Sequence, residues 1–335
     1  MATSTFDTYE AKGMKESFSD LIFNISPTET PFLSMIGTTT SKQRLHQWQK
    51  DTLDSPALNV QAEGDGTAAS VTIGATTATT VDQNYCQIST KVFGVSGTLE
   101  VTEKYGRDSS MAYQTAKAAR SLKTDVDFTM TGSVQEAILS TGGPPGDYKR
   151  ASGALPCWLG TNFVTTNDGV APVGSNGTNA PTNGTVAAFT QSHLDTCIQD
   201  AWVNGGKPSV ILAGGAQKTN ISGFDGVTGT ALSSGNSTMR TDRATKTITA
   251  TADMYISNFG DLRIVPSRHI YDAGGAFDRT VFVIDPELFK FAVLRPWQQF
   301  DLAKTGDTIN RELLVEWTLQ SSNEAGSGQI ADCAN

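Results

Sequence analysis

The sequence is poor in the residues from which most catalytic and metal sites are built. It holds only three histidines, far apart, and they form no His-Glu-x-x-His or His-x-His motif. The cysteines are widely spaced and form no Cys-x-x-Cys pair: Cys86, Cys157, Cys197 and Cys333. We therefore expect free thiols in a reducing compartment, and neither a zinc site nor a disulfide framework.

Charge is also scarce. Charged residues make up 18% of the chain and the net charge is −9. Lys149-Arg150 is the longest basic pair, whereas phosphate binding needs clustered Lys and Arg, so sequence-specific nucleic-acid binding is not expected. Mild acidity favours the solubility of a concentrated subunit.

Targeting signals and long apolar runs are missing as well. The first residues show no signal-peptide pattern, and apolar runs such as residues 280–284 have the length of a core strand. We therefore predict that the protein does not associate with a membrane. We expect it to assemble in a cytoplasm. No long charged helical segment precedes the N-terminal region, so a large cleaved prodomain is not expected.

The 335 residues, 38% of them hydrophobic, suffice for a sizeable core. Residues 1–43 read as an arm with little local core, in which Phe18, Leu21 and Ile22 have helical spacing. Two prolines then predict an extended or turning segment over residues 25–33. Phe32 and its apolar neighbours need burial elsewhere.

Residues 44–103 predict a long hairpin. Its first limb is 44–50 and its second is 85–102, with bends at Gly94 and Gly97. The connection between the limbs is too long for an ordinary compact domain. Because a two-stranded arm cannot bury itself, the hairpin implies a partner surface.

Residues 104–187 combine a helix and a turn-rich stretch. The spacing predicts a helix over 108–141, which would be about 50 Å long, ended by glycines and prolines. Charged residues along it argue against a membrane span. Residues 142–187 read as an exposed insertion anchored by residues 157–159.

Residues 188–310 predict an α/β domain. We expect a helix over 190–204, a strand over 209–213 and a short helix after Gly215. Further strands are expected at 246–251, 261–266 and 280–284. A helix over 286–303 is expected because Asp285 is a good N-cap, with Pro296 breaking it.

Residues 311–335 predict a returning strand over 311–319, able to pair with the base of the hairpin. The tail from Asn323 is expected to be loose.

Two short motifs suggest chemistry but fail in detail. Residues 214–219 follow a strand and open a helix, yet Gln217 stands where a phosphate loop needs glycine. Glu63 and Asp65 at the hairpin tip lack the further carboxylates of a calcium loop. We therefore predict no catalytic residue, metal ligand or cofactor.

The order of the parts resembles the major capsid proteins of tailed bacteriophages, with an α+β, Hong Kong 97-type fold. Segments across nearly the whole chain carry the resemblance: residues 25–32, 45–49, 285–297, 302–307 and 316–319. The resemblance implies an N-arm, an extended β-hairpin loop, a peripheral domain with a long spine helix, and an axial domain. Residues 142–187 fit it least.

The same resemblance implies self-assembly into hexamers and pentamers of an icosahedral shell around double-stranded DNA. It also implies a scaffolding protein and a portal during assembly, the virion capsid as final location, and in some relatives a cement protein. We expect assembly contacts at six residues: Phe32, Trp48, Glu63, Asp65, Arg295 and Trp297. The alternatives are a tail-tube or fibre subunit, and a phosphate-binding enzyme using residues 214–219.

Overall fold

The computed structural model describes residues 29–335 apart from 54–55, 57, 59, 61–62, 64–77, 140–148, 225–239, 243–246, 250–252, 272–278, 305 and 335. Most of the expected N-terminal arm, including its helical spacing at Phe18–Ile22, therefore lies outside the described residues, as does Asp65. Within them the chain is a mixture of helix and sheet, as the α+β pattern predicts.

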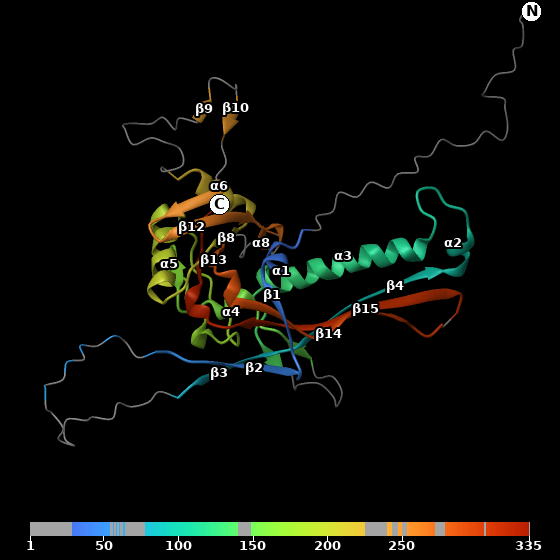
Figure 1. The fold of residues 1–335 in the computed structure, drawn as a ribbon. Helices are drawn as coiled ribbons and strands as arrows, with labels where there is room; N and C mark the ends of the chain where they lie inside the picture. The colour runs from blue at the N-terminus through green and yellow to red at the C-terminus, as the bar shows by residue number, and fades with distance from the viewer. Residues whose placement is uncertain are drawn as a thin grey trace, which may run out of the picture.

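A four-stranded sheet has one long helix lying along it (Figure 1). Its strand order is β1 (Gly37–Thr40), β14 (Phe289–Asp301), β15 (Thr308–Ser321), β4 (Gln87–Ser96). β1 runs parallel to β14, and the other pairs are antiparallel. The helix α3 (Ser110–Thr131) begins at Ser109, whose side chain accepts the Ala112 amide. α2 (Gly97–Val101) connects β4 to it.

A six-stranded sheet forms the second body. Its order is β11 (Met254–Ser257), β12 (Gly260–Pro266), β8 (Val210–Ala213), β13 (Val281–Ile284), β16 (Gly328–Ala331), β7 (Phe163–Thr165). Four helices accompany it: α4 (Leu155–Trp158), α5 (Gln191–Val203), α6 (Gly215–Ser222) and α8 (Arg268–Tyr271). β8 and β13 are buried at every position, as continuous apolar runs predict for central strands.

Smaller elements complete the described chain. The two-stranded pairs are β2 (Leu45–Lys50) with β3 (Thr80–Tyr85), β5 (Ile138–Leu139) with β6 (Arg150–Ala151), and β9 (Arg240–Asp242) with β10 (Thr247–Thr249). The short helical segments are α1 (Pro31–Met35), η1 (Val173–Ser175), η2 (Pro286–Leu288) and η3 (Glu324–Gly326).

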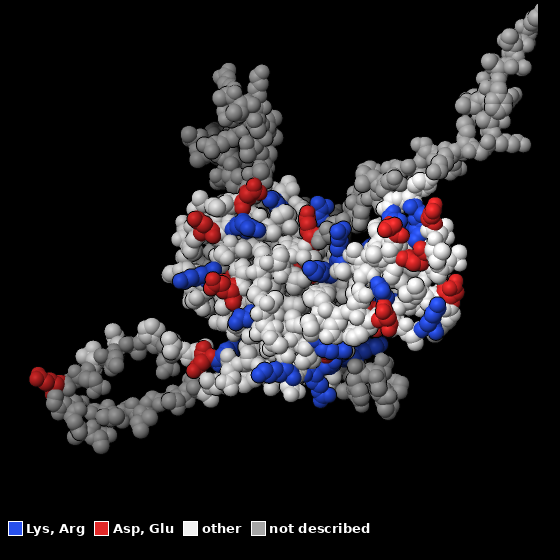
Figure 2. Space-filling view, turned by 45° about the vertical axis from the view of Figure 1, so that its right-hand side comes forward, with Lys and Arg blue, Asp and Glu red and all other residues white. Residues whose placement is uncertain are grey.

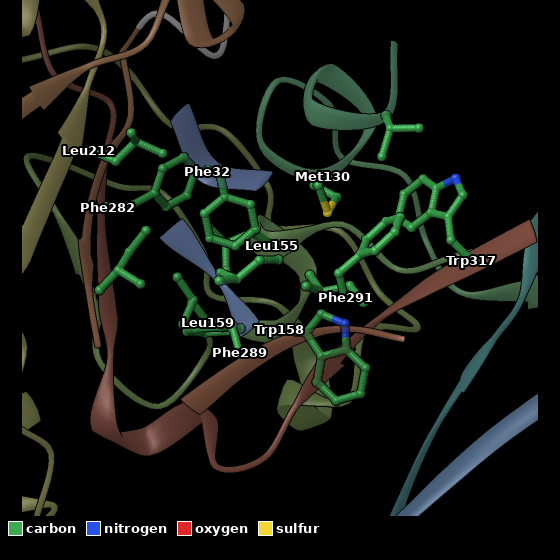
Figure 3. Packing of buried hydrophobic residues seen from close by; sticks show 14 of the residues in the cluster. Phe32, Met130, Leu155, Trp158, Leu159, Leu212, Phe282, Phe289, Phe291 and Trp317 are labelled. Carbon is green, nitrogen blue, oxygen red and sulfur yellow. The ribbon is translucent and has the colours of Figure 1, made fainter. Parts of the chain in front are cut away.

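One apolar core joins elements from the whole length of the chain. Side chains of α1, α3, α4, β13, β14 and β15 point toward one another in it (Figure 3). Phe32 meets Phe289 edge to face with ring centroids 6.1 Å apart, and Phe291 stacks on Trp317 at 5.4 Å. A second cluster lies between α5, α6 and the six-stranded sheet. Trp158 is fully buried, so residues 157–159 do anchor their segment as predicted.

Several predicted elements match. The helix over 190–204 is α5, the strand over 209–213 is β8, and the returning strand is β15, which pairs with β4. The expected helix over 108–141 is shorter, because it ends at Gly132. Its 22 residues span about 33 Å.

Two predictions are wrong. Residues 289–301 form the strand β14 and not a helix; Asp285 does cap the Glu287 amide, but only the single turn η2 follows. The tail from Asn323 is not loose, because β16 pairs with β13 and β7 and is buried throughout.

The hairpin also differs in detail. The limb that pairs with residues 45–50 is β3, and β4 continues beyond Cys86 to pair with β15. Gly94 lies in regular register opposite Asn310 rather than at a bend.

Candidate assembly surfaces

The β2–β3 hairpin is held firmly at its base. Trp48 packs on Trp158 with ring centroids 5.4 Å apart. Asn84, fully buried, donates to the carbonyl oxygen of Leu319 at 2.7 Å, and Lys50 pairs with Asp82 at 2.7 Å. These contacts fix the direction in which the two limbs leave the body.

Beyond this base the described side chains lie in water. Leu53, Leu58 and Val60 are 98%, 100% and 88% exposed. These three apolar side chains are almost fully exposed to water. Burying each of them against another surface would stabilise the bound state by about 1.5–3 kcal/mol. The hairpin beyond Lys50 therefore has the chemistry of a docking arm.

The far end of the β14–β15 pair is a second apolar surface. Trp297, Phe300, Leu302 and Ile309 are each about 40% exposed. The strands run out beside α3 to this end (Figure 1). The register pairs Phe300 with Glu312, three positions from Ile309, so Phe300 and Ile309 lie on opposite faces of the sheet, and both faces at this end carry exposed apolar side chains. Exposed apolar surface of this kind is a feature of protein–protein contacts.

Strand β4 contributes a third surface, at an open edge of the four-stranded sheet. Its side chains alternate: Val95 is buried, while Ile88 and Val92 are 45% and 62% exposed on the other face. An apolar face on an edge strand favours pairing with another chain.

A buried carboxylate organises the base of the β14–β15 pair. Glu316 accepts from Arg150 Nη2 at 2.6 Å and from Arg295 Nε at 2.7 Å. The Glu316 side chain is 5% exposed and that of Arg295 is 42% exposed. Arg295 therefore neutralises a buried charge with one edge of its guanidinium and keeps part of its side chain in water.

The fourth apolar surface is a pair of aromatic side chains at the end of α5. Trp202 and Phe259 pack at 5.2 Å and are 53% and 38% exposed. Figure 2 shows acidic and basic side chains among neutral surface on one face, with basic side chains gathered along its lower edge.

The predicted assembly residues fall into two groups. Phe32 and Trp48 are buried within the chain's own core. Glu63, Arg295 and Trp297 are at least partly exposed, and they stay predictions as assembly contacts. Sequence reasoning missed Val92 and Ile88, which the structure places on the more exposed face of the alternating strand β4.

The chemical alternatives gain little from the geometry. In α6, Lys218 pairs with Asp253 at 3.0 Å, and the buried Gln217 side chain donates to the Ala334 carbonyl oxygen. Burial raises the pKa of Cys157 and of Cys333 to about 12, opposite to what a nucleophile needs. Within the described ranges no His, Cys, Asp and Glu cluster suits a metal ion, and no helix has the length and apolarity of a membrane span.

Comparison with known proteins identifies the family. The model of the family described as SU10 major capsid protein matches residues 1–334. The major capsid protein of Escherichia phage Phieco32 is 33% identical over 164 residues, which cover 48% of this chain and 44% of that protein. The match thus spans less than half of the length of this curated relative.

Solved structures share the fold at low sequence identity. A chain of Mycobacterium phage Adephagia is 11% identical with a TM-score of 0.62, and 99% of each chain is covered. A chain of the capsid of a native GTA particle is 10% identical with a TM-score of 0.58, and 98% of each is covered. Since the family model spans nearly the whole sequence, the chain belongs to the SU10 major capsid protein family.

Proposed function

We propose that the chain is the major capsid protein of a tailed phage and assembles into the icosahedral shell around its double-stranded DNA. The observation that carries the proposal is the family match over residues 1–334. The fold shared with capsid chains supports it. The role is structural, and the chain's function is to bind copies of itself.

The parts of a Hong Kong 97-type subunit have natural counterparts here. Residues 1–43 correspond to the N-arm, the β2–β3 hairpin within 44–103 to the extended loop, and α3 to the spine helix. The six-stranded sheet corresponds to the axial domain. β7 and β16 both pair inside that sheet, so the axial part would draw on residues 163–165 and 328–331 as well as on 188–310.

The exposed apolar side chains explain why such a subunit would assemble. Leu53, Leu58 and Val60 project on an arm that cannot bury them internally. Val92 and Trp297 offer apolar surface on the sheet of another copy. Several modest contacts in each subunit add to a large total over a closed, symmetric shell.

Within the proposal the copies form hexamers and pentamers in the host cytoplasm and end in the virion. A scaffolding protein and a portal act during assembly, and the packaged DNA lies nearby without sequence-specific contacts. A cement protein is a further partner. Residues 142–187, anchored by Trp158, would be an insertion specific to one lineage of these capsid proteins.

Electron microscopy of the expressed chain, with its scaffolding protein supplied if needed, tests the proposal. We expect shells or capsomers for the natural sequence. Persistent monomers under all assembly conditions would contradict it.

A loop variant tests the mechanism. Residues 52–78 are replaced by an Asn-Gly turn, which leaves β2 and β3 paired and suits a two-residue hairpin. We expect a folded monomer that does not assemble. The matched control is Val173→Ser, which removes a 73% exposed apolar side chain from another segment and should leave shells intact. Normal shells from the loop variant would refute the docking role.

No specific observation favours the tail-tube, fibre or enzyme alternatives. For the enzyme, thermal unfolding with millimolar nucleotide is the direct measurement. A clear rise in Tm would support phosphate binding near Lys218.

A further inference from the structure

A buried carboxyl group near the C-terminal end of α3 holds the first described segment of the chain. Asp127 has a fully buried side chain, and its Oδ1 accepts the Leu33 amide at 2.8 Å. Leu33 lies in the first turn of α1, whose preceding residue Thr30 makes no side-chain cap. Asp127 therefore caps α1 from 94 residues away in sequence.

His269 of α8 closes the same site from the other side. Its Nε2 lies 2.8 Å from the carbonyl oxygen of Glu29 and 3.7 Å from Asp127 Oδ2. The segment from Glu29 to Leu33 is thus clamped between α3 and α8.

The described elements that pack on α3 carry further charged groups: Glu316 of β15 is held by Arg150 and Arg295, and Glu100 of α2 accepts the Ser109 hydroxyl. The Glu29 carboxylate faces Arg268 at 3.6 Å, with both side chains about two-thirds exposed. On α3 itself, Asp125 pairs with Lys91 of β4 at 2.7 Å. α4, which also packs on α3, carries Cys157 as its titratable group. The pKa of Asp127 is thus raised mainly by burial, which is opposed first by the Leu33 amide and then by His269.

The carboxyl group is poorly compensated for a full negative charge. Asp127 Oδ2 is buried and has no hydrogen-bond partner. Burial raises the pKa of Asp127 to about 6, against the opposing effects of the Leu33 amide and His269. Release of the segment would hydrate the carboxylate and return its pKa toward 3.8.

We propose that Asp127, His269 and the Glu29–Leu33 segment form a proton-controlled latch. The closed latch keeps the proton on the buried carboxyl group, and loss of that proton favours release of the segment from α3. Because the folded-state pKa is raised, the stabilisation of the closed state is full at low pH and falls as pH rises through the pKa. This device works within one chain and does not depend on the shell proposal.

Amide hydrogen exchange of the full chain at several pH values tests the latch. The readout is the opening of residues 32–36, corrected for the intrinsic pH dependence of exchange and referred to the amides of β15. The pKa change from 3.8 to about 6 predicts about tenfold more opening near pH 7.5 than near pH 5. The opening of the β15 amides should show no comparable dependence on pH.

Variants separate the latch from general effects of pH. Asp127→Asn keeps an acceptor for the Leu33 amide and should abolish the pH dependence. Asp125→Asn, two positions away on the same helix, should behave as the natural chain. His269→Gln should move the midpoint to higher pH, because the attraction of His269 for the carboxylate is lost.

The outcomes are decisive in either direction. A flat profile in the natural chain, or an unchanged profile in Asp127→Asn, overturns the proposal. If Asp127→Asn does not fold, the His269→Gln midpoint decides: a shift to higher pH supports the latch and an unchanged midpoint rejects it.

Discussion

The two ion pairs of Glu316 should differ in strength because water reaches one of them. Arg150 and Glu316 are 18% and 5% exposed, whereas the Arg295 side chain is 42% exposed. A charged hydrogen bond shielded from water contributes about 1.5–3 kcal/mol. An ion pair open to solvent contributes about 0.2–1 kcal/mol. We therefore predict that the Arg150–Glu316 coupling is the larger of the two, by a factor of at least about 1.5.

Double-mutant cycles measure both couplings. The variants are Arg150→Met, Arg295→Met and Glu316→Gln, singly and in the two pairs, with the free energy of unfolding of unassembled subunits taken from urea titrations. Raising the salt concentration should weaken mainly the Arg295 coupling. Equal couplings, or a larger one for Arg295, would refute the reasoning from solvent exposure.

Three further predictions concern stability and reactivity. Gly177→Ala should destabilise the chain more than Gly205→Ala in urea titrations: both have positive φ, costing about 1–2 kcal/mol, but a Cβ at Gly177 would lie 2.6 Å from the Trp158 ring and one at Gly205 meets nothing within 4 Å. The Glu100 carboxylate accepts hydrogen bonds at the start of α3, and these lower its pKa, the Ser109 hydroxyl having the largest effect. That stabilisation is present above the unfolded pKa and lost as pH falls through the folded one, so Glu100→Gln should speed amide exchange in the first turn of α3 at neutral pH and not in acid. All four thiols are buried, so a thiol reagent should label Cys157 and the others slowly in the native chain and completely after denaturation.

Elements with strong local signals were predictable from the sequence. α5 carries an apolar stripe with the spacing of a helix. β8 and β13 are short continuous apolar runs, a pattern typical of strands buried on both faces. The Asp285 cap was also predictable, since this cap joins Asp285 to the Glu287 amide only two residues further on. The matched capsid-like segments correctly indicated the family.

The structure of residues 289–301 was not predictable in this way. Leu288, Phe289, Ala292 and Val293 fit a helical stripe, whereas Phe289 and Phe291 fit a strand alternation. Asp285 and Pro286 favoured the helix. β14 lies between β1 and β15, so pairing on both edges outweighs the local preference. Pro296 lies within a register shift, the one kind of place where a central strand tolerates it.

Assembly surfaces depended on the tertiary structure even more. The sequence alone determined that the chain has a core, a long hairpin connection and few residues suited to chemistry. Only the fold decided that Phe32 and Trp48 are buried while Val92 and Trp297 are exposed, because burial depends on what packs from distant parts of the chain. The clamp on Glu29–Leu33 likewise joins residues that are 94 and 240 positions apart, and no local pattern records such a contact.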